Sequence, residues 1–330
     1  MAYRIRLQST GHSFESHPRE SILHAGLNAG LNLTHSCENG SCGECRARLL
    51  QGKIEAIKHS DFMLTELERA DNQFLMCCHQ ALSDCCIEAA EVNDPADIPE
   101  QRLFGKIGRV EQLNDQVVEF SVRLQRSKGL KFLAGQSVSL FFDGMRPKSL
   151  PMANCPCDSS RLRFQLRRRD DAFSEFVFNT LKKGREVIVA GPQGDFTLDE
   201  ESNRSLLFVA WESGFAPISS LIDHAISQNP DRRIRLIWLG ETASSHYLEN
   251  QCRAWRDALD DFDYQLVKTN GLIAQGFYST IQQVLKQSMP IDAWDLYMTV
   301  PPSVQYAACQ LFCEAGLPAT QIKVALMQHA

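Results

Sequence analysis

The sequence predicts a multidomain chain of mixed α+β and α/β structure, and three observations support this. A compact cysteine motif lies near the N-terminus, at residues 37–45. Strand-like runs separated by turn residues fill the middle third, and strands alternate with helices from Ser205 onward. At 330 residues the chain is long enough for two or three domains. We therefore expect a small metal-binding domain, an antiparallel β domain and a parallel α/β domain.

The cysteine motif predicts an iron–sulfur cluster. Four residues separate Cys37 from Cys42, two separate Cys42 from Cys45, and 31 separate Cys45 from Cys77. This is the plant-type spacing for a [2Fe–2S] cluster held by four thiolates. Three thiolates then reach the cluster from one tight loop, and Cys77 closes the site from a distant segment.

Two alternatives to the cluster fit this spacing less well. A structural zinc site usually pairs two C-x2-C arms, whereas Cys77-Cys78 offers no second arm. A set of unpaired core cysteines does not predict the spacing at all. Gly40 and Gly43 also suit a loop that must turn with positive φ close to the sulfides.

Composition limits the classes of partner and compartment. The chain is 44% hydrophobic and 22% charged, and its net charge of −6 argues against nucleic acid as the main partner. No apolar run approaches the length of a membrane span, and the first residues lack the apolar region of a signal peptide, so we expect a cytoplasmic protein. The eight cysteines outside the cluster set are interpreted as reduced thiols, and a redox-active Cys155-Pro156-Cys157 pair is the less favoured interpretation.

The first 92 residues read as one small domain. Residues 3–9 alternate as a strand, residues 21–31 form an amphipathic helix, residues 46–50 form a strand, and a short helix starts at Thr65. This order resembles the β-grasp fold of plant-type ferredoxins. Residues 93–100, rich in proline and acidic side chains, are predicted to be a linker.

Two larger domains follow the linker. Residues 101–203 carry five strand-like runs and one helix, which suggests an antiparallel β-barrel (strands near 103–113, 117–124, 137–142, 161–167 and 186–190; helix near 173–181). Residues 204–330 alternate between strands and helices, which predicts a Rossmann-like, doubly wound parallel sheet. Its ligand crevice should lie at the carboxyl ends of the strands, near 210–217 and 300–302.

Four short motifs connect this domain order to a known family. They are residues 132–136 (FLAGQ), 152–156 (MANCP), 191–196 (GPQGDF) and 215–217 (FAP). With them, the whole chain resembles the reductase components of multicomponent oxygenases and CDP-6-deoxyglucoseen-type reductases, within the ferredoxin–NADP reductase superfamily. The resemblance implies that NAD(P)H reduces FAD, and that single electrons then pass to the cluster and to a redox protein partner such as an oxygenase.

The flavin motifs depart from the family pattern. The family's R-x-Y-S becomes residues 148–151, in which Lys148 lacks the arginine fork, Leu150 replaces the tyrosine that packs on the flavin ring, and Pro151 has neither a hydroxyl nor an N–H. The family's phosphate-binding G-x-x-S becomes residues 171–174, which keep Ser174 but begin with an acid. The resemblance also assigns Met152 and Phe173 to this region. We therefore expect a weakened FAD site, and we interpret the arginines at 167–169 as a solvated strand face.

The nucleotide loop departs further. Residues 210–217 keep Gly214 and Pro217, but Trp211 and Glu212 stand where the family has glycines. A bulky indole is expected to obstruct the pyrophosphate, and a carboxylate to repel it. Thr299-Val300 also replaces the cysteine and glycine beside the nicotinamide. These changes predict that NAD(P)H is a poor direct donor.

Three functions are compatible with these motifs. The first is an electron-transfer oxidoreductase of the oxygenase-reductase type. The alternative is a ferredoxin-like accessory or partner-binding subunit, whose reductase half has lost NAD(P)H use and which receives electrons from a separate reductase. A flavoenzyme acting on its own substrate in the remodelled crevice is less favoured, since no Ser/His/Asp triad or metal-ligand helix stands out.

Overall fold

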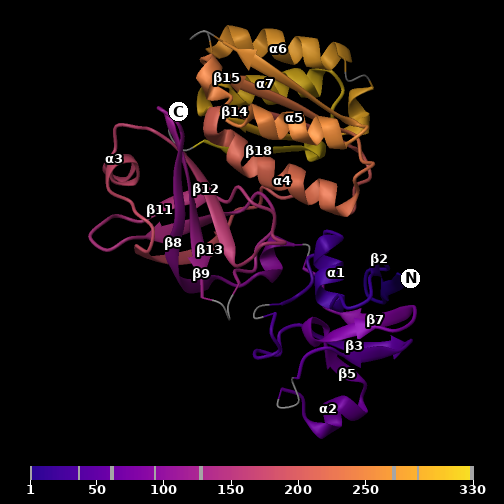
Figure 1. Ribbon diagram of the computed structural model, residues 1–330. Helices are drawn as coiled ribbons and strands as arrows, with labels where there is room; N and C mark the ends of the chain where they lie inside the picture. Colours follow the sequence, from indigo (N-terminus) through magenta and orange to yellow (C-terminus); the bar gives the residue numbers. More distant parts are fainter. Residues whose placement is uncertain are drawn as a thin grey trace.

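Three β-sheets follow one another along the chain in a computed structural model (Figure 1). The structure describes residues 2–35, 38–59, 63–92, 94–125, 129–269, 273–287 and 290–327. Each sheet has its own buried apolar core. The predicted α+β and α/β multidomain class is confirmed.

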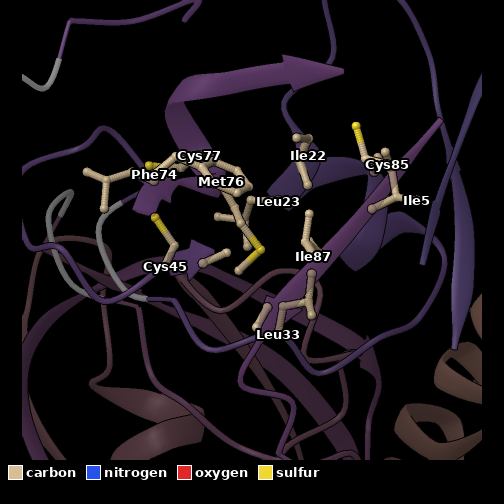
Figure 2. Packing of buried hydrophobic residues seen from close by; sticks show 14 of the residues in the cluster. Ile5, Ile22, Leu23, Leu33, Cys45, Phe74, Met76, Cys77, Cys85 and Ile87 are labelled. Carbon is tan, nitrogen blue, oxygen red and sulfur yellow. The ribbon is translucent and has the colours of Figure 1, made fainter. Parts of the chain in front are cut away.

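The N-terminal sheet has the strand order β2-β1-β7-β3-β5. Strand β1 pairs antiparallel with β2 and parallel with β7, while helix α1 covers the sheet with a face of buried residues (Figures 1 and 2). The elements are β1 Tyr3–Leu7, β2 Ser13–Ser16, α1 Ile22–Asn28, β3 Arg46–Gln51, β4 Ile54–Ala56, α2 Glu66–Ala70, β5 Gln73–Leu75, η1 Met76–Cys78, β6 His79–Ala81, β7 Cys85–Ala89 and η2 Pro95–Asp97. Strands β4 and β6 form a separate pair.

The middle sheet is antiparallel throughout, with the order β11-β10-β13-β8-β9-β12. Its elements are β8 Gln101–Asn114, β9 Val117–Leu124, β10 Ser137–Phe141, β11 Lys148–Pro151, β12 Arg161–Arg167, α3 Ala172–Asn179 and β13 Glu186–Gln193. The sheet encloses an apolar core in which Phe120 stacks on Phe164 with ring centroids 5.3 Å apart. Strands β11 and β12 lie at the two ends of the strand order.

The C-terminal sheet is parallel, with the order β16-β15-β14-β17-β18. Helices α4 and α5 pack on one face and helices α6 and α7 on the other, because successive residues of β14 enter two different cores. The elements are β14 Ser205–Trp211, η3 Glu212–Gly214, α4 Phe215–Gln228, β15 Ile234–Gly240, η4 Ala243–Ser245, α5 Glu249–Ala258, β16 Phe262–Lys268, α6 Ile273–Gln287, η5 Ile291–Ala293, β17 Trp294–Val300, α7 Pro302–Glu314, η6 Ala319–Gln321 and β18 Ile322–Leu326. None of the described helices is long and apolar enough to cross a bilayer.

Close contacts join the N-terminal sheet region to the rest of the chain. Gly30 has φ +80°, and a Cβ there would lie 2.4 Å from the Gln228 side chain and 2.7 Å from its backbone nitrogen. The Gln228 amide donates to the Gly30 carbonyl over 3.3 Å. Lys131 Nζ lies 2.7 Å from Glu44 Oε2, next to the cysteine loop. Position 30 therefore has no room for a side chain without moving α4.

Candidate functional site

The cysteine loop leads directly into β3, and the distant cysteine arrives on η1. Gly40 and Gly43 have φ values of +83° and +77°, as the loop prediction required. The backbone N–H of Met76 donates to the Cys45 carbonyl over 2.9 Å, and this bond holds η1 against the end of the loop. The Cys42 thiol accepts from the Glu44 N–H at 3.5 Å.

Two of the predicted ligands, Cys45 and Cys77, meet in a buried position. Their exposed fractions are 2% and 1%, and both lie beside Met76 in the close view of the N-terminal core (Figure 2). A hydrogen bond with Cys45 raises the pKa of the Cys77 thiol well above its usual range, and burial raises it further. Two buried thiols this close deprotonate readily only when a cation neutralises them, so the donor set suits a thiolate-bound metal group.

The structure describes only one of the other two predicted ligands. Cys42 is partly exposed on the same loop, and Cys37 lies outside the described residues. Within the described ranges, no three His, Cys, Asp or Glu side chains converge at metal-binding distance. Cys78, which is not among the predicted ligands, is buried with its sulfur 3.5 Å from that of Cys77.

A second feature is a cavity of about 410 Å³ between the middle and C-terminal sheets. Its walls come from β11, from β12 and the residues after it, and from the carboxyl ends of β14 and β17 together with β18. Five of the predicted cofactor residues line it: Lys148, Leu150, Pro151, Gly214 and Pro217. Arg167 and Arg169 also line it. The interpretation of these two arginines as a solvated strand face is therefore wrong; Arg168 instead lies over the Phe178 ring at 4.2 Å.

One carboxylate already occupies the helix N-terminus beside this cavity. Asp171 Oδ1 accepts from the Ser174 N–H at 2.7 Å and so caps α3. Its other oxygen lies 3.3 Å from Lys148 Nζ. Burial raises the pKa of Asp171, but the Ser174 N–H and Lys148 outweigh it, so the net pKa is lowered. The Ser174 hydroxyl accepts from the Arg169 N–H at 2.8 Å.

A second carboxylate occupies the crevice of the parallel sheet. Glu212 has φ +48°, and its side chain is only 4% exposed. It forms an ion pair with Arg167, and its Oε1 accepts from the Glu241 N–H at 2.6 Å and from the Ser245 hydroxyl at 2.8 Å. The charge of Glu212 is therefore compensated inside the protein, by a partner that the sequence analysis missed.

Three further residues with predicted cofactor roles lie in cores instead of lining the cavity. Trp211 is 3% exposed and packs in the core between the parallel sheet and α6–α7. The expectation that its indole obstructs a pyrophosphate is therefore wrong, because alternation along β14 turns this side chain into the core. Met152 and Phe173 are buried in the core of the middle sheet. Thr299, by contrast, is buried but lines the cavity, and its hydroxyl donates to the Gly214 carbonyl at 3.1 Å.

The chain is similar to known proteins over both halves. The 2Fe-2S iron-sulfur cluster binding domain family matches residues 5–82, a range that contains all four predicted ligands. Terephthalate 1,2-dioxygenase reductase component 1 of Comamonas sp is 30% identical over 264 residues, which cover 80% of this chain and 78% of the relative. The chain belongs to this family of iron–sulfur oxygenase reductases.

Further relatives and solved structures are similar to this chain. The CDP-6-deoxy-L-threo-D-glycero-4-hexulose-3-dehydrase reductase of Yersinia pestis is 28% identical over 256 residues, covering 77% of this chain and 76% of the relative. The solved Amycolatopsis cytochrome P450 reductase GcoB superposes with a TM-score of 0.60 at 21% identity, covering 98% of each chain. Phthalate dioxygenase reductase gives 0.57 at 19% identity, over 71% of this chain and 70% of that one. These two structural likenesses show the fold. The family match shows an electron-transfer oxidoreductase with a [2Fe–2S] domain, and none of the comparisons supports the accessory-subunit alternative.

Proposed function

We propose that this chain is the reductase component of a multicomponent oxygenase, and that it delivers single electrons through a [2Fe–2S] cluster to a protein acceptor. The observation that carries the proposal is the presence, in one chain, of the buried Cys45–Cys77 pair and of a cavity between a β-barrel edge and a parallel sheet. Cys37, Cys42, Cys45 and Cys77 would hold the cluster. The domain division 1–92, 93–100, 101–203 and 204–330 is part of this proposal. The linker at 93–100 is supported by the segment between β7 and β8, in which the only helix or strand among the described residues is the short helix η2.

The cavity is proposed to hold FAD. Its charged lining, Lys148 and Arg169, suits the anionic pyrophosphate, and its apolar lining, Leu150 and Phe196, suits a flat ring. When bound, FAD supplies the conversion between two-electron and one-electron chemistry. The chain's own residues bind the phosphates, orient the ring and exclude water. Because Asp171 already holds Lys148, we expect flavin to be bound more weakly than a free lysine would allow.

Direct use of a pyridine nucleotide is proposed to be slow. The carboxylate of Glu212, not the indole of Trp211, is the obstacle, because it holds Arg167 in an ion pair and accepts the Glu241 N–H and the Ser245 hydroxyl. A nucleotide phosphate must compete with this internal anion for the same donors. The proposed electron donor is therefore NAD(P)H, used at a low rate.

The test is the cofactor content and the reduction kinetics of the purified protein. We expect about two irons and two sulfides per chain, a rhombic signal after reduction, and a potential near about −400 mV. Cluster reduction by NADH or NADPH in a stopped-flow instrument should be slow compared with reduction by dithionite. Stoichiometric zinc without acid-labile sulfide would contradict the cluster, and rapid reduction at micromolar NADH would contradict the slow-donor proposal.

A double substitution in β11 tests the flavin proposal. Replacing Leu150 by Tyr together with Pro151 by Ser should increase FAD retention after gel filtration, since the pair restores a ring-packing side chain and an N–H donor. Unchanged flavin content in this double variant would argue against the cavity as the flavin site.

A further inference from the structure

A tight turn outside the cavity described above brings two cysteines together. The Asp158 N–H donates to the Cys155 carbonyl at 3.2 Å, which closes a β-turn with Pro156 at its second position. The Asn154 amide donates to the carbonyls of both Cys155 and Asp158 at 3.0 Å and holds the turn in place. Cys155 and Cys157 are the first and third residues of this turn, and the Cys157 backbone nitrogen lies only 3.4 Å from the Cys155 sulfur.

The two thiols differ in access and in acidity. Cys157 is exposed, whereas Cys155 is buried. A hydrogen bond with Cys155 lowers the pKa of Cys157 to about 7, and the same bond raises the pKa of Cys155. The Cys157 N–H also donates to the Cys155 sulfur at 3.4 Å. The pair therefore has an accessible thiol that ionises near neutral pH, and a buried neighbour within reach.

Charged and titratable groups surround the turn on the side of α4. His224 Nδ1 lies 4.0 Å from the Cys155 sulfur, and its Nε2 lies 3.0 Å from Glu200 Oε1. Burial raises the pKa of Asp223 to about 6, and both Asp223 and the turn's own Asp158 oppose ionisation of Cys157. The proximity of Cys155 outweighs these two carboxylates.

We propose that Cys155 and Cys157 form a reversible dithiol–disulfide pair that reacts with low-molecular-weight disulfides such as oxidised glutathione. The Cys157 thiolate attacks one glutathione sulfur, forms a mixed disulfide and releases one glutathione thiolate. The Cys155 thiol then loses its proton and attacks the Cys157 sulfur, which releases the second glutathione. The protein loses two electrons and two protons, and one glutathione disulfide becomes two glutathiones.

The position of this pair gives it a structural consequence. Ser219 and Ser220 of α4 donate to the carbonyls of Ala153 and Asn154 at 3.1 and 2.7 Å, immediately before the turn. On its other side, Ser159 Oγ lies 3.4 Å from His35 Nε2, just before the cysteine loop. Closing the disulfide changes the turn between these anchors. The pair thus acts at the contact between the ferredoxin domain and the rest of the chain.

Mass spectrometry of the full-length, cluster-loaded protein tests the pair directly. After incubation with oxidised glutathione, we expect an intramolecular Cys155–Cys157 disulfide, a mass lower by two hydrogen atoms, and reversal by dithiothreitol. Cys157→Ser should prevent it. Cys313→Ser, which removes another exposed thiol, should leave it unchanged. Free Cys155 and Cys157 under conditions that glutathionylate Cys313 would overturn the proposal.

A second variant keeps the test decisive if Cys157→Ser folds poorly. Cys155→Ser removes the second attacking thiol, so the first step should stop at a stable glutathione adduct on Cys157. A disulfide between Cys157 and any other cysteine, or no adduct at all, would contradict the proposed order. In the wild-type protein, hydrogen exchange of residues 31–35 should rise several-fold on oxidation, and the same treatment of Cys157→Ser should leave it unchanged. Hydrogen exchange does not depend on electron transfer. A negative result here would therefore contradict the disulfide proposal without bearing on the proposed reductase function.

Discussion

The cysteine loop and the inter-sheet cavity differ in how their charges are balanced. In the loop, Cys45 and Cys77 are buried together, and hydrogen bonding and burial keep the Cys77 proton bound. Around the cavity, cations and anions are already paired: Lys148 with Asp171, and Arg167 with Glu212. Ionisation of the Cys77 thiol is therefore disfavoured in the protein alone, whereas the two cations beside the cavity already have carboxylate partners.

This difference teaches how to interpret departures from a motif. When each residue is considered alone, an acidic residue in a phosphate-binding motif, such as Asp171 or Glu212, suggests that the chain no longer binds the phosphate. The structure shows that each acid has a cationic partner, and we propose that a phosphate ligand would use the same cation. On this proposal the carboxylate competes with the ligand phosphate for the cation and does not block the space, so one substitution can remove the effect.

The largest expected effect concerns the loop. Cys77→Ser should abolish the cluster or leave it badly destabilised, since a buried thiolate ligand is lost, whereas Cys78→Ser should retain it although the two sulfurs are only 3.5 Å apart. Iron and acid-labile sulfide analysis with electron paramagnetic resonance measures both variants. Loss of the cluster in both variants would contradict the prediction that Cys77, and not Cys78, is the ligand.

The second effect tests whether Trp211 is a core residue or lies in the crevice. Trp211→Gly should reduce the free energy of unfolding by about 3–5 kcal/mol, because it leaves a cavity in a packed core. Leu67→Ala, at a side chain that is 83% exposed, should change it by less than about 0.5 kcal/mol. Denaturant unfolding provides the comparison. Unchanged stability in Trp211→Gly, with better nucleotide binding, would restore the obstruction hypothesis.

The third effect tests competition in the crevice. Glu212→Gln should raise kcat/KM for NADH by about tenfold, since about 1.4 kcal/mol of released attraction between Arg167 and phosphate corresponds to that factor. The gain should appear mainly as a lower KM and shrink at high salt. Glu241→Gln is the control, because Glu241 lies farther from Arg167, at 3.6 Å, and is more exposed. An equal gain in both variants would indicate a general charge effect.

The smallest effect concerns flavin retention. Asp171→Asn keeps a good helix cap while releasing Lys148, so the FAD dissociation constant should fall by about twofold to fivefold. Asp171→Ala, which also loses the cap, should be less stable than Asp171→Asn. Fluorescence titration with FAD measures the first comparison and thermal unfolding the second.

The pH dependence of stability gives an independent check on Asp171. Because its pKa is lowered in the folded state, its contribution is present above the ordinary aspartate pKa of about 3.9 and is lost as the pH falls through the folded value. The stability difference between wild type and Asp171→Asn should therefore disappear in acid. A difference that grows as the pH falls would have the wrong sign.

Much of the fold could be predicted from the sequence, because long strands with clear alternation dominate it. Strands β9 and β12 have the predicted bounds, Val117–Leu124 and Arg161–Arg167. Strands β11 and β18 were not predicted, since both are short edge strands and β11 ends in a proline. Edge strands of this length carry little periodic signal.

The candidate sites were predictable to different degrees. Spacing alone indicated the cluster ligands, because three of them lie within nine residues. The partnership of Arg167 with Glu212 could not be predicted, since it joins two sheets whose relative placement only the folded chain sets. The orientation of Trp211 depends on where β14 ends, and strand ends are the least certain part of a prediction from sequence.

The lack of space for a side chain at Gly30 limits which domains of this reductase can be exchanged with those of related proteins. Any larger residue there would overlap Gln228 of α4, so the ferredoxin domain and the C-terminal domain are in close contact at this point. A chimaera that carries the ferredoxin domain of another reductase inherits this surface only if its own chain is equally small at that point. Domain grafts in this family should therefore be designed as matched pairs, with the helix end and the α4 face exchanged together.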